Sequence, residues 1–256
     1  MNPHNESVAH ADEVVLTKLG AMITQACADP SLELELRLGV LGDGGRRFVP
    51  GVSRKHMDVL VSSLDALCAL GEDGARDEDL DCHGARRTMR ATHDAWTEHE
   101  DYHYLDPLAP PRKLRTRATY DGSQLRWTTV HKKVVDSVLL RTRVMDVRVA
   151  LARELPVADP VVLVPTTHVR IKQRRSFVAT RTPFRFDCSF VWCGTTLTEA
   201  QQAQVADDPI FEIECELLPD RRAEWLRARG ARTAAKSLLT KAANAMRSTG
   251  VFFEQA

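Results

Sequence analysis

The stretch LELELRLG, residues 32–39, alternates strictly between leucine and a charged side chain until the final glycine. Successive side chains of a β-strand point to opposite faces of a sheet, so this period of two predicts a strand. Its leucines share one face, and Glu33, Glu35 and Arg37 share the other. The stretch therefore predicts a strand with one apolar face and one charged face.

Four further stretches have the same two-faced character. Their charged faces carry these side chains: Arg148 and Glu154 in residues 147–155; Arg170, Lys172 and Arg174 in residues 169–177; Arg185, Asp187 and Ser189 in residues 184–190; and Glu212, Glu214 and Glu216 in residues 211–217. For a single strand, a charged face that points to water is the ordinary interpretation. Here like charges stand two residues apart, roughly 7 Å from each other, and such a row repels itself.

The remaining sequence predicts helices around these strands. Residues 12–28 have helical spacing of apolar side chains, and a basic helix is expected over about residues 221–247, interrupted at Gly230. Consecutive strands joined by turn signals, such as Asp121-Gly122, favour an antiparallel sheet, and closure into a barrel would remove its edges. We therefore interpret residues 1–256 as one mostly-β domain with flanking helices, whose core strands span about residues 32–218.

Helices that cover the apolar strand faces leave the charged faces pointing into such a barrel. A dry interior cannot hold so many charges, because each uncompensated ion costs several kcal/mol. The interior is therefore expected to be a hydrated tunnel. Carboxylates from two strands suit a hard divalent cation, Mg²⁺ or Mn²⁺, and the opposing arginine and lysine row suits phosphate oxygens. Together they point to chemistry on a triphosphate.

Composition excludes several other classes. The 256 residues hold 35 lysines and arginines and 35 aspartates and glutamates, so a generically basic polyanion binder is unlikely on charge alone. No apolar run is long enough for a membrane span, and no secretion signal is visible at the N-terminus. The six cysteines form no C-x-x-C pair, which disfavours a zinc ribbon or a disulfide framework. The P-loop and Lys-x-Asp-Gly motifs are absent, and so is the glycine-rich loop that carries the cysteine and arginine of cysteine phosphatases.

The five motifs, in this order and phase, resemble the fungal and protozoan type of metal-dependent RNA triphosphatase. These are the mRNA-capping members of the triphosphate tunnel metalloenzymes, and the resemblance runs from about residue 32 to residue 218. In size the chain is similar to the compact enzymes of kinetoplastid protozoa. The resemblance implies a mainly β, α+β fold, in which a closed eight-stranded antiparallel β-barrel is flanked by helices.

The resemblance also implies individual roles. Metal ligation falls to Glu33, Glu35 and Glu216 with Glu214, and Glu212 forms salt bridges to tunnel bases. Glu154 positions or deprotonates the attacking water. Phosphate binding or catalysis falls to Arg115 or Arg117, Arg148, Arg170, Lys172, Arg174, Arg185, Asp187 and Ser189. On the strand near residue 132 the family tends to offer an inward lysine, for which we select Lys133, with His131 beside it.

The implied reaction is removal of the γ-phosphate from triphosphate-ended RNA, the first step of cap formation, with NTP hydrolysis in Mn²⁺ as a side activity. A separate guanylyltransferase is the implied partner, and a nuclear location follows only from the capping role. Two alternatives stay open: a small-molecule tri- or polyphosphatase of the same fold, and an inactive polyphosphate or RNA-end binding module. We expect His93, His99 and His103 to be solvated, and residues 72–81 to form a surface insertion.

Overall fold

The computed structural model describes residues 13–69, 79–80, 86–87, 91–93, 95–106, 111–121, 124–142, 145–157, 165–179 and 182–248. The predicted surface insertion at residues 72–81 lies almost wholly outside them. The α-helices are α1 (Glu13–Ala28), α2 (Arg54–Ala69), α4 (Leu197–Val205), α5 (Pro219–Arg229) and α6 (Ala231–Ser248), and a 3-10 turn spans Asp43–Gly45. In the described part of the chain, no helix is both long and apolar enough to traverse a lipid bilayer.

The strands account for most of the remaining described residues. They are β1 (Leu32–Gly42), β2 (Arg47–Pro50), β3 (Asp79–Leu80), β4 (Arg86–Arg87), β5 (Ala91–His93), β6 (Thr97–Leu105), β7 (Lys113–Asp121), β8 (Gln124–Leu140), β9 (Asp146–Val157), β10 (His168–Ala179), β11 (Phe184–Gly194) and β12 (Ile210–Leu217).

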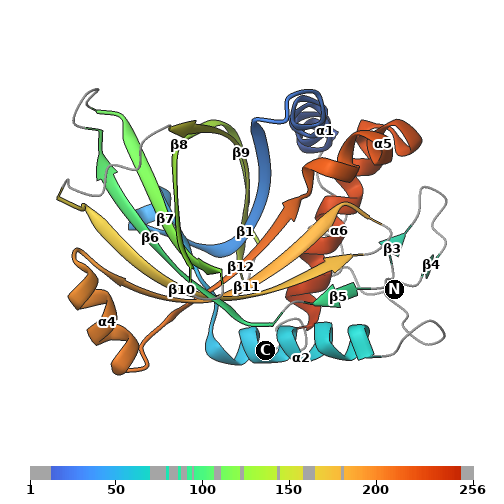
Figure 1. The fold of residues 1–256 in the computed structure, drawn as a ribbon. Coiled ribbons are helices and arrows are strands. Elements are labelled where there is room, and N and C mark those ends of the chain that lie inside the picture. Colours follow the sequence, from blue (N-terminus) through green and yellow to red (C-terminus); the bar gives the residue numbers. More distant parts are fainter. Residues whose placement is uncertain are drawn as a thin grey trace.

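Eight of these strands form a closed ring (Figure 1). The order is β11-β12-β1-β9-β8-β7-β6-β10, and β10 pairs again with β11 to close it. Every pairing in the ring is antiparallel. The predicted closed eight-stranded antiparallel barrel with flanking helices is therefore confirmed. Outside the ring, β2 pairs with β1 and β5 with β10.

The hairpin of β1 and β2 depends on a glycine at its closest approach. A Cβ at Gly39 would lie 2.2 Å from the carbonyl oxygen of Val49, so β2 could not fold back over a larger residue here. This close packing explains why the alternating leucine pattern of β1 ends in glycine at that position.

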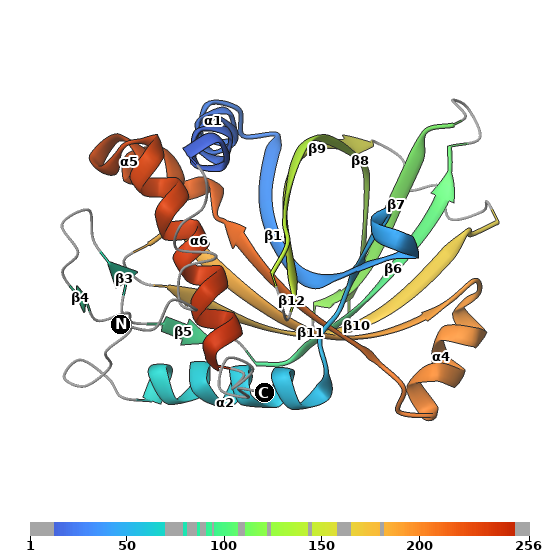
Figure 2. The same ribbon diagram turned by 180° about the vertical axis from the view of Figure 1, so that it is seen from behind.

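The main hydrophobic core lies outside the barrel wall. Four leucines of β1, with Val149 and Leu151 of β9 and Ile213 of β12, are at most 5% exposed and belong to one cluster with α1, α2 and α6; the leucines are Leu32, Leu34, Leu36 and Leu38. Figures 1 and 2 show α1, α5 and α6 gathered at one side of the barrel and α4 at the opposite side. The apolar strand faces thus pack against helices, and the charged faces turn into the ring.

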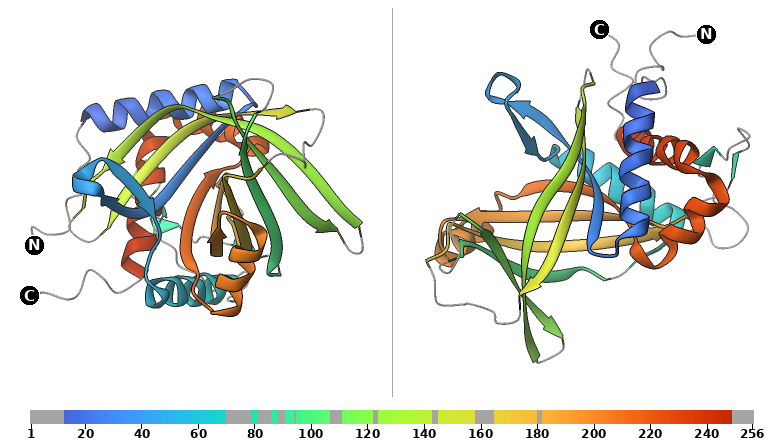
Figure 3. Two further views of the ribbon diagram at one scale, coloured as in Figure 1. Left: turned by 90° about the vertical axis from the view of Figure 1, so that its left-hand side faces the viewer. Right: turned by 90° about the horizontal axis from the view of Figure 1, so that it is seen from above.

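The C-terminal helical region is divided at Gly230, as the sequence predicts. Gly230 has φ 76°, a conformation that favours glycine, and it separates α5 from α6. Figure 3 shows the two helices meeting at an angle beside α1. The basic residues of this region are not uniformly solvated, because Arg222 and Lys241 are at most 2% exposed.

Arg222 fastens α5 to the start of the barrel. Its guanidinium donates hydrogen bonds to the carbonyl oxygens of Leu32, at 2.8 Å, and Asp29, at 3.0 Å. Arg222→Met should leave these acceptors unpaired and lower the free energy of unfolding by about 1–3 kcal/mol, measured by urea denaturation. Arg227→Met, on the exposed face of the same helix, is the control and should change stability little. Equal effects of the two variants would contradict the anchoring role.

Candidate active site

The inner wall of the ring encloses a cavity of about 380 Å³. Among the described residues, ten lysines and arginines and seven aspartates and glutamates line it, so the bases exceed the acids by three. The acids are Glu33, Glu35, Asp101, Glu154, Asp187, Glu214 and Glu216. The bases are Arg37, Lys113, Arg115, Arg117, Lys132, Arg148, Arg170, Lys172, Arg174 and Arg185. Such a wall suits a ligand that carries several negative charges.

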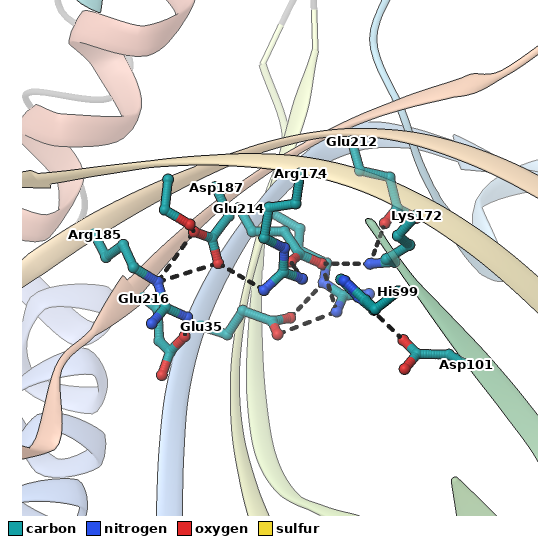
Figure 4. Close-up of polar contacts among 12 residues, drawn as sticks. Glu35, His99, Asp101, Lys172, Arg174, Arg185, Asp187, Glu212, Glu214 and Glu216 are labelled. Carbon is teal, nitrogen blue, oxygen red and sulfur yellow. Dashed lines mark hydrogen bonds and ion pairs between the residues drawn. The ribbon is translucent and has the colours of Figure 1, made fainter. Parts of the chain in front are cut away.

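A cluster of carboxylates comes from β1 and β12, whose pairing places Glu35 directly opposite Glu216. Figure 4 shows these two side chains near Arg185 and Asp187 at one end of a charged row. Burial raises the pKa of the Glu216 carboxyl to about 7; Arg185 opposes this rise, and the negative charges of Glu33, Asp187 and Glu35 add to it. The carboxylates therefore crowd one another at this end of the cavity.

A row of bases on β10 faces the acids of β12. The Nζ atom of Lys172 lies 3.0 Å from an oxygen of Glu212 and 3.8 Å from one of Glu214. Arg170 also pairs with Glu212, while Arg174 contacts Glu214 at 3.3 Å. Glu212 is 2% exposed and is absent from the cavity lining, so it acts from behind the bases. Its predicted pairing with tunnel bases is what the structure contains.

Paired charges keep this part of the wall ionised. Burial acts to raise the pKa of Glu214, but Arg37, Lys172 and Arg174 hold that pKa well below its usual value. Burial lowers the pKa of Lys172, and Glu214 and Glu212 oppose that change. A multiply charged anion that enters the cavity therefore meets bases held in place by internal counter-ions.

The third side of the wall comes from β7 and β9. Arg117 donates two hydrogen bonds to Asp101, at 2.7 and 3.0 Å. Arg115 donates one to Glu154, at 3.0 Å. Burial acts to raise the pKa of Glu154, but Arg115 and Lys132 lower it below its usual value. The sequence left open whether Arg115 or Arg117 faces the cavity. Both arginines line it, and each pairs with a different carboxylate.

Strand β6 is the part of the barrel that the sequence analysis missed. It puts His99, Asp101 and His103 on one face, and Asp101 and His103 line the cavity. Alternation was hidden because the opposite face also carries acids, Glu98 and Glu100. The signal that could have found β6 is the run of three aromatic or histidine residues at its end, which fits a half-buried strand.

The prediction of solvated histidines is wrong for His99, which is 6% exposed. Burial, together with the positive charge of Arg117, lowers the pKa of His99 to about 3. The imidazole is therefore neutral at ordinary pH and lies among the bases in Figure 4. The solvated interpretation failed because β6 is a ring strand whose inner face is enclosed; the side chain of His93 lies outside the described ones.

The lysine of β8 that faces the cavity is Lys132, one residue before the predicted Lys133. Lys132 lines the cavity, whereas Lys133 is exposed and absent from the lining. His131 donates a hydrogen bond from Nδ1 to the carbonyl oxygen of Lys113, 2.9 Å away, and does not line the cavity. The selection of Lys133 as a phosphate-binding residue is therefore corrected to Lys132.

A β-bulge in β8 explains the error. On the N-terminal side of the bulge, Lys132 pairs with Glu154, which lines the cavity, so even-numbered residues of β8 face inward there. Beyond the irregularity at residues 134–136, Leu139 pairs with Arg148, which also lines the cavity, so odd-numbered residues face inward. The bulge inserts one extra residue, which exchanges the two faces of the strand. Alternation counted from the C-terminal half consequently selects Lys133.

The other predicted site residues fall into two groups. Those that line the cavity are Glu33, Glu35, Arg115, Arg117, Arg148, Glu154, Arg170, Lys172, Arg174, Arg185, Asp187, Glu214 and Glu216. Ser189, predicted to bind phosphate, is completely buried and lies outside the cavity lining. Its backbone pairs with Arg174 on one side and Glu212 on the other, so it packs beneath the charged row.

The carboxylate oxygens of the cavity are the candidate ligands of a divalent cation. Within the described ranges, no three histidine, cysteine, aspartate or glutamate side chains are grouped as a metal site as they stand. The reason is that each carboxylate is turned toward a base, in the pairs Glu33–Lys132, Glu35–Arg37 and Glu216–Arg185. The donor set still fits a hard cation, because it offers only oxygen atoms and its crowding raises the pKa of Glu216. Binding requires bases to release their partners.

Comparison with known proteins gives structural neighbours but no sequence relatives. No protein-family model matches the chain, and no curated protein matches it by sequence. The Schizosaccharomyces pombe Pct1 RNA triphosphatase superimposes with a TM-score of 0.64 at 17% identity, covering 92% of this chain and 91% of that chain. The same enzyme in complex with the Spt5 CTD gives 0.64 at 15% identity, covering 96% and 95%. The mimivirus capping enzyme triphosphatase gives 0.58 at 11% identity, covering 94% and 99%. At these identities the likeness concerns the fold: this chain has the tunnel fold of RNA triphosphatases.

Proposed function

We propose that this protein is an RNA 5′-triphosphatase that removes the γ-phosphate from triphosphate-ended RNA, the first step of mRNA cap formation. The observation that carries the proposal is the cavity inside the closed barrel, where the described bases exceed the described acids by three. Support also comes from the likeness in fold to two RNA triphosphatases, from S. pombe and mimivirus. More specifically, we propose that the protein is an RNA triphosphatase of the compact kinetoplastid type.

In this proposal the bases of the wall bind and orient the triphosphate. Lys172, Arg174 and Arg117 hold the γ-phosphate, and Arg185 contacts it from β11. Arg115, Arg148 and Arg170 extend the binding surface along the cavity. Fixed positive charges of this kind stabilise the negative charge that develops when the bond to the β-phosphate breaks.

Glu154 is proposed to orient the attacking water. Its carboxylate lines the cavity and its pKa is held below the usual value, so it remains ionised and can accept a hydrogen bond from water. Water attack on the γ-phosphorus transfers this phosphoryl group to the water oxygen and releases diphosphate-ended RNA and inorganic phosphate. No covalent phosphoenzyme is needed.

Mg²⁺ or Mn²⁺ is the proposed cofactor. Glu33, Glu35 and Glu216 would hold it, with Glu214 and Asp187 in support. When bound, such an ion polarises phosphoryl oxygens and neutralises their charge. The proposal includes NTP hydrolysis in Mn²⁺.

The test is release of labelled γ-phosphate from triphosphate-ended RNA and from ATP, each in Mg²⁺ and in excess EDTA. We expect release from RNA in Mg²⁺, with a higher kcat/KM than for ATP, and complete, reversible loss in EDTA. Preference for ATP or tripolyphosphate would instead favour a small-molecule tri- or polyphosphatase. Binding of triphosphate RNA without any release would identify an inactive binding module.

Capping also implies partners and a location. The proposed partner is a separate guanylyltransferase, because the chain has no Lys-x-Asp-Gly nucleophile motif. Two neighbours support a capping-related role in general: the S. pombe enzyme is solved in complex with the Spt5 CTD, and the mimivirus domain belongs to a trifunctional mRNA capping enzyme. A nuclear location is the corresponding proposal.

A further inference from the structure

Lys132 is placed among three carboxylates of the cavity. Its Nζ atom forms an ion pair with Glu33 and lies 3.5 Å from Glu35 and 3.3 Å from Glu154. These acids come from β1 and β9, whereas Lys132 comes from β8. One ammonium group therefore serves three carboxylates that would otherwise repel one another.

Ion pairs to all three carboxylates fix the position of this ammonium group. Among the described lysines of the wall, Lys172 contacts two acids and Lys132 contacts three. Arg37 and Arg115 also contact Glu35 and Glu154, respectively, but Lys132 is the base that links all three carboxylates.

The proposed function assigns metal binding and the orientation of the attacking water to these same acids. Glu33 and Glu35 are the proposed metal ligands of β1, and Glu154 is the proposed partner of the attacking water. A lone pair that is engaged by the ammonium group is not available to a divalent cation, so the two cations compete for the same oxygen atoms.

We propose that Lys132 is an internal counter-ion of the metal site: it holds the carboxylates together in the metal-free protein, and the divalent cation displaces it toward the phosphates of the substrate. The inference rests on the proposed metal-dependent function and deepens it. The cavity of about 380 Å³ beside Lys132 gives its side chain room to move. A lysine suits this exchange, because its four-carbon stem is flexible and its three donors rotate freely.

One consequence is that metal and triphosphate bind cooperatively. Release of the carboxylates by Lys132 frees one positive charge for phosphate oxygens at the moment the cation arrives. Without the cation, the same charge stays committed to Glu33, Glu35 and Glu154.

The experiment measures Mn²⁺ binding to the full chain by calorimetry, without phosphate, for the wild type and for Lys132→Met and Lys133→Met. Both variants remove one positive charge from the same strand, but Lys133 is exposed and outside the cavity lining. We expect Lys132→Met to lower the Kd for Mn²⁺ by about tenfold or more, which corresponds to about 1.4 kcal/mol per factor of ten. Lys133→Met should leave the Kd unchanged.

Two further readouts make the result independent of folding and of turnover. Mn²⁺ should raise the melting temperature of Lys132→Met, and of the polar variant Lys132→Gln, more than that of the wild type. Mn²⁺ should also improve the affinity for inorganic tripolyphosphate less in Lys132→Met than in the wild type. Unchanged or weaker Mn²⁺ binding by both Lys132 variants overturns the counter-ion role.

The outcomes separate this inference from the proposed function. If the wild type binds Mn²⁺ and releases γ-phosphate but Lys132→Met binds Mn²⁺ no more tightly, only the counter-ion role fails. If Lys132→Met binds Mn²⁺ more tightly and no phosphate is released from RNA by the wild type, only the proposed reaction fails. If neither protein binds Mn²⁺, the metal site and the counter-ion role both fail.

Discussion

Replacing Glu216 by alanine should reduce the release of γ-phosphate by about a thousandfold or more, since a bound metal supplies several kcal/mol and each 1.36 kcal/mol is a factor of ten. Glu216 lies opposite Glu35 in the β1–β12 pairing and lines the cavity. Burial raises its pKa, and the negative charges of Glu33, Asp187 and Glu35 add to that rise, so Glu216 belongs to a crowded acidic cluster. Loss of this carboxylate removes a proposed ligand and leaves Arg185 with Asp187 as its remaining partner.

The measurement is kcat for triphosphate-ended RNA in Mg²⁺, combined with the Kd for Mn²⁺. Asp208→Ala is the control, because Asp208 is an exposed carboxylate just before the same strand. Its kcat should match the wild type. Wild-type turnover of Glu216→Ala would show that the metal assignment on β12 is wrong, even if the fold is unchanged.

The second large effect is expected for Lys172→Ala, which should lower both activity and stability. Lys172 is 2% exposed and pairs with Glu212 at 3.0 Å. Removal of one member of a buried ion pair typically costs about 3–5 kcal/mol of stability, because the other charge stays buried. Removal of a fixed positive charge from the transition-state site should further cost about 10²–10³-fold in kcat.

A double variant separates the two effects. Lys172→Met combined with Glu212→Gln removes both charges of the pair and keeps an amide oxygen at position 212 for Arg170, so urea denaturation should show a free energy of unfolding nearer to the wild type than that of Lys172→Met alone. The activity should stay low in the double variant, because no charge returns to the cavity. Recovery of activity together with stability would mean that Lys172 acts only as a structural partner of Glu212.

Much of the barrel could be predicted from the sequence because its strands alternate so regularly. In β1 and β12, leucine, isoleucine or cysteine faces the helices and glutamate faces inward, so period two fixes both the strand and the face of Glu33, Glu35 and Glu216. Closure of the ring followed from the need to cover the apolar faces and to remove sheet edges. These arguments use only local pattern and charge.

The remaining features depend on information that one strand does not contain. The inward face of Lys132 rests on a bulge at residues 134–136, and a bulge has no strong signature in the sequence. The pairing of Arg117 with Asp101 could be predicted only if β6 were recognised as a strand, and its two polar faces hide the alternation. The burial of Ser189 beneath the charged row depends on how three neighbouring strands pack, which alternation alone does not determine.

The order of the strands around the ring has a consequence for biosynthesis. The bases of β10 leave the ribosome before β12, which brings Glu212 and Glu214 to neutralise them, and β1 waits longest for its partners in β9 and β12. A nascent chain that stops before residue 210 therefore exposes two unpaired strand edges and leaves Arg170 and Lys172 without the carboxylate of Glu212. Chaperone engagement should be strongest at that stage and should end when the last strand is inserted.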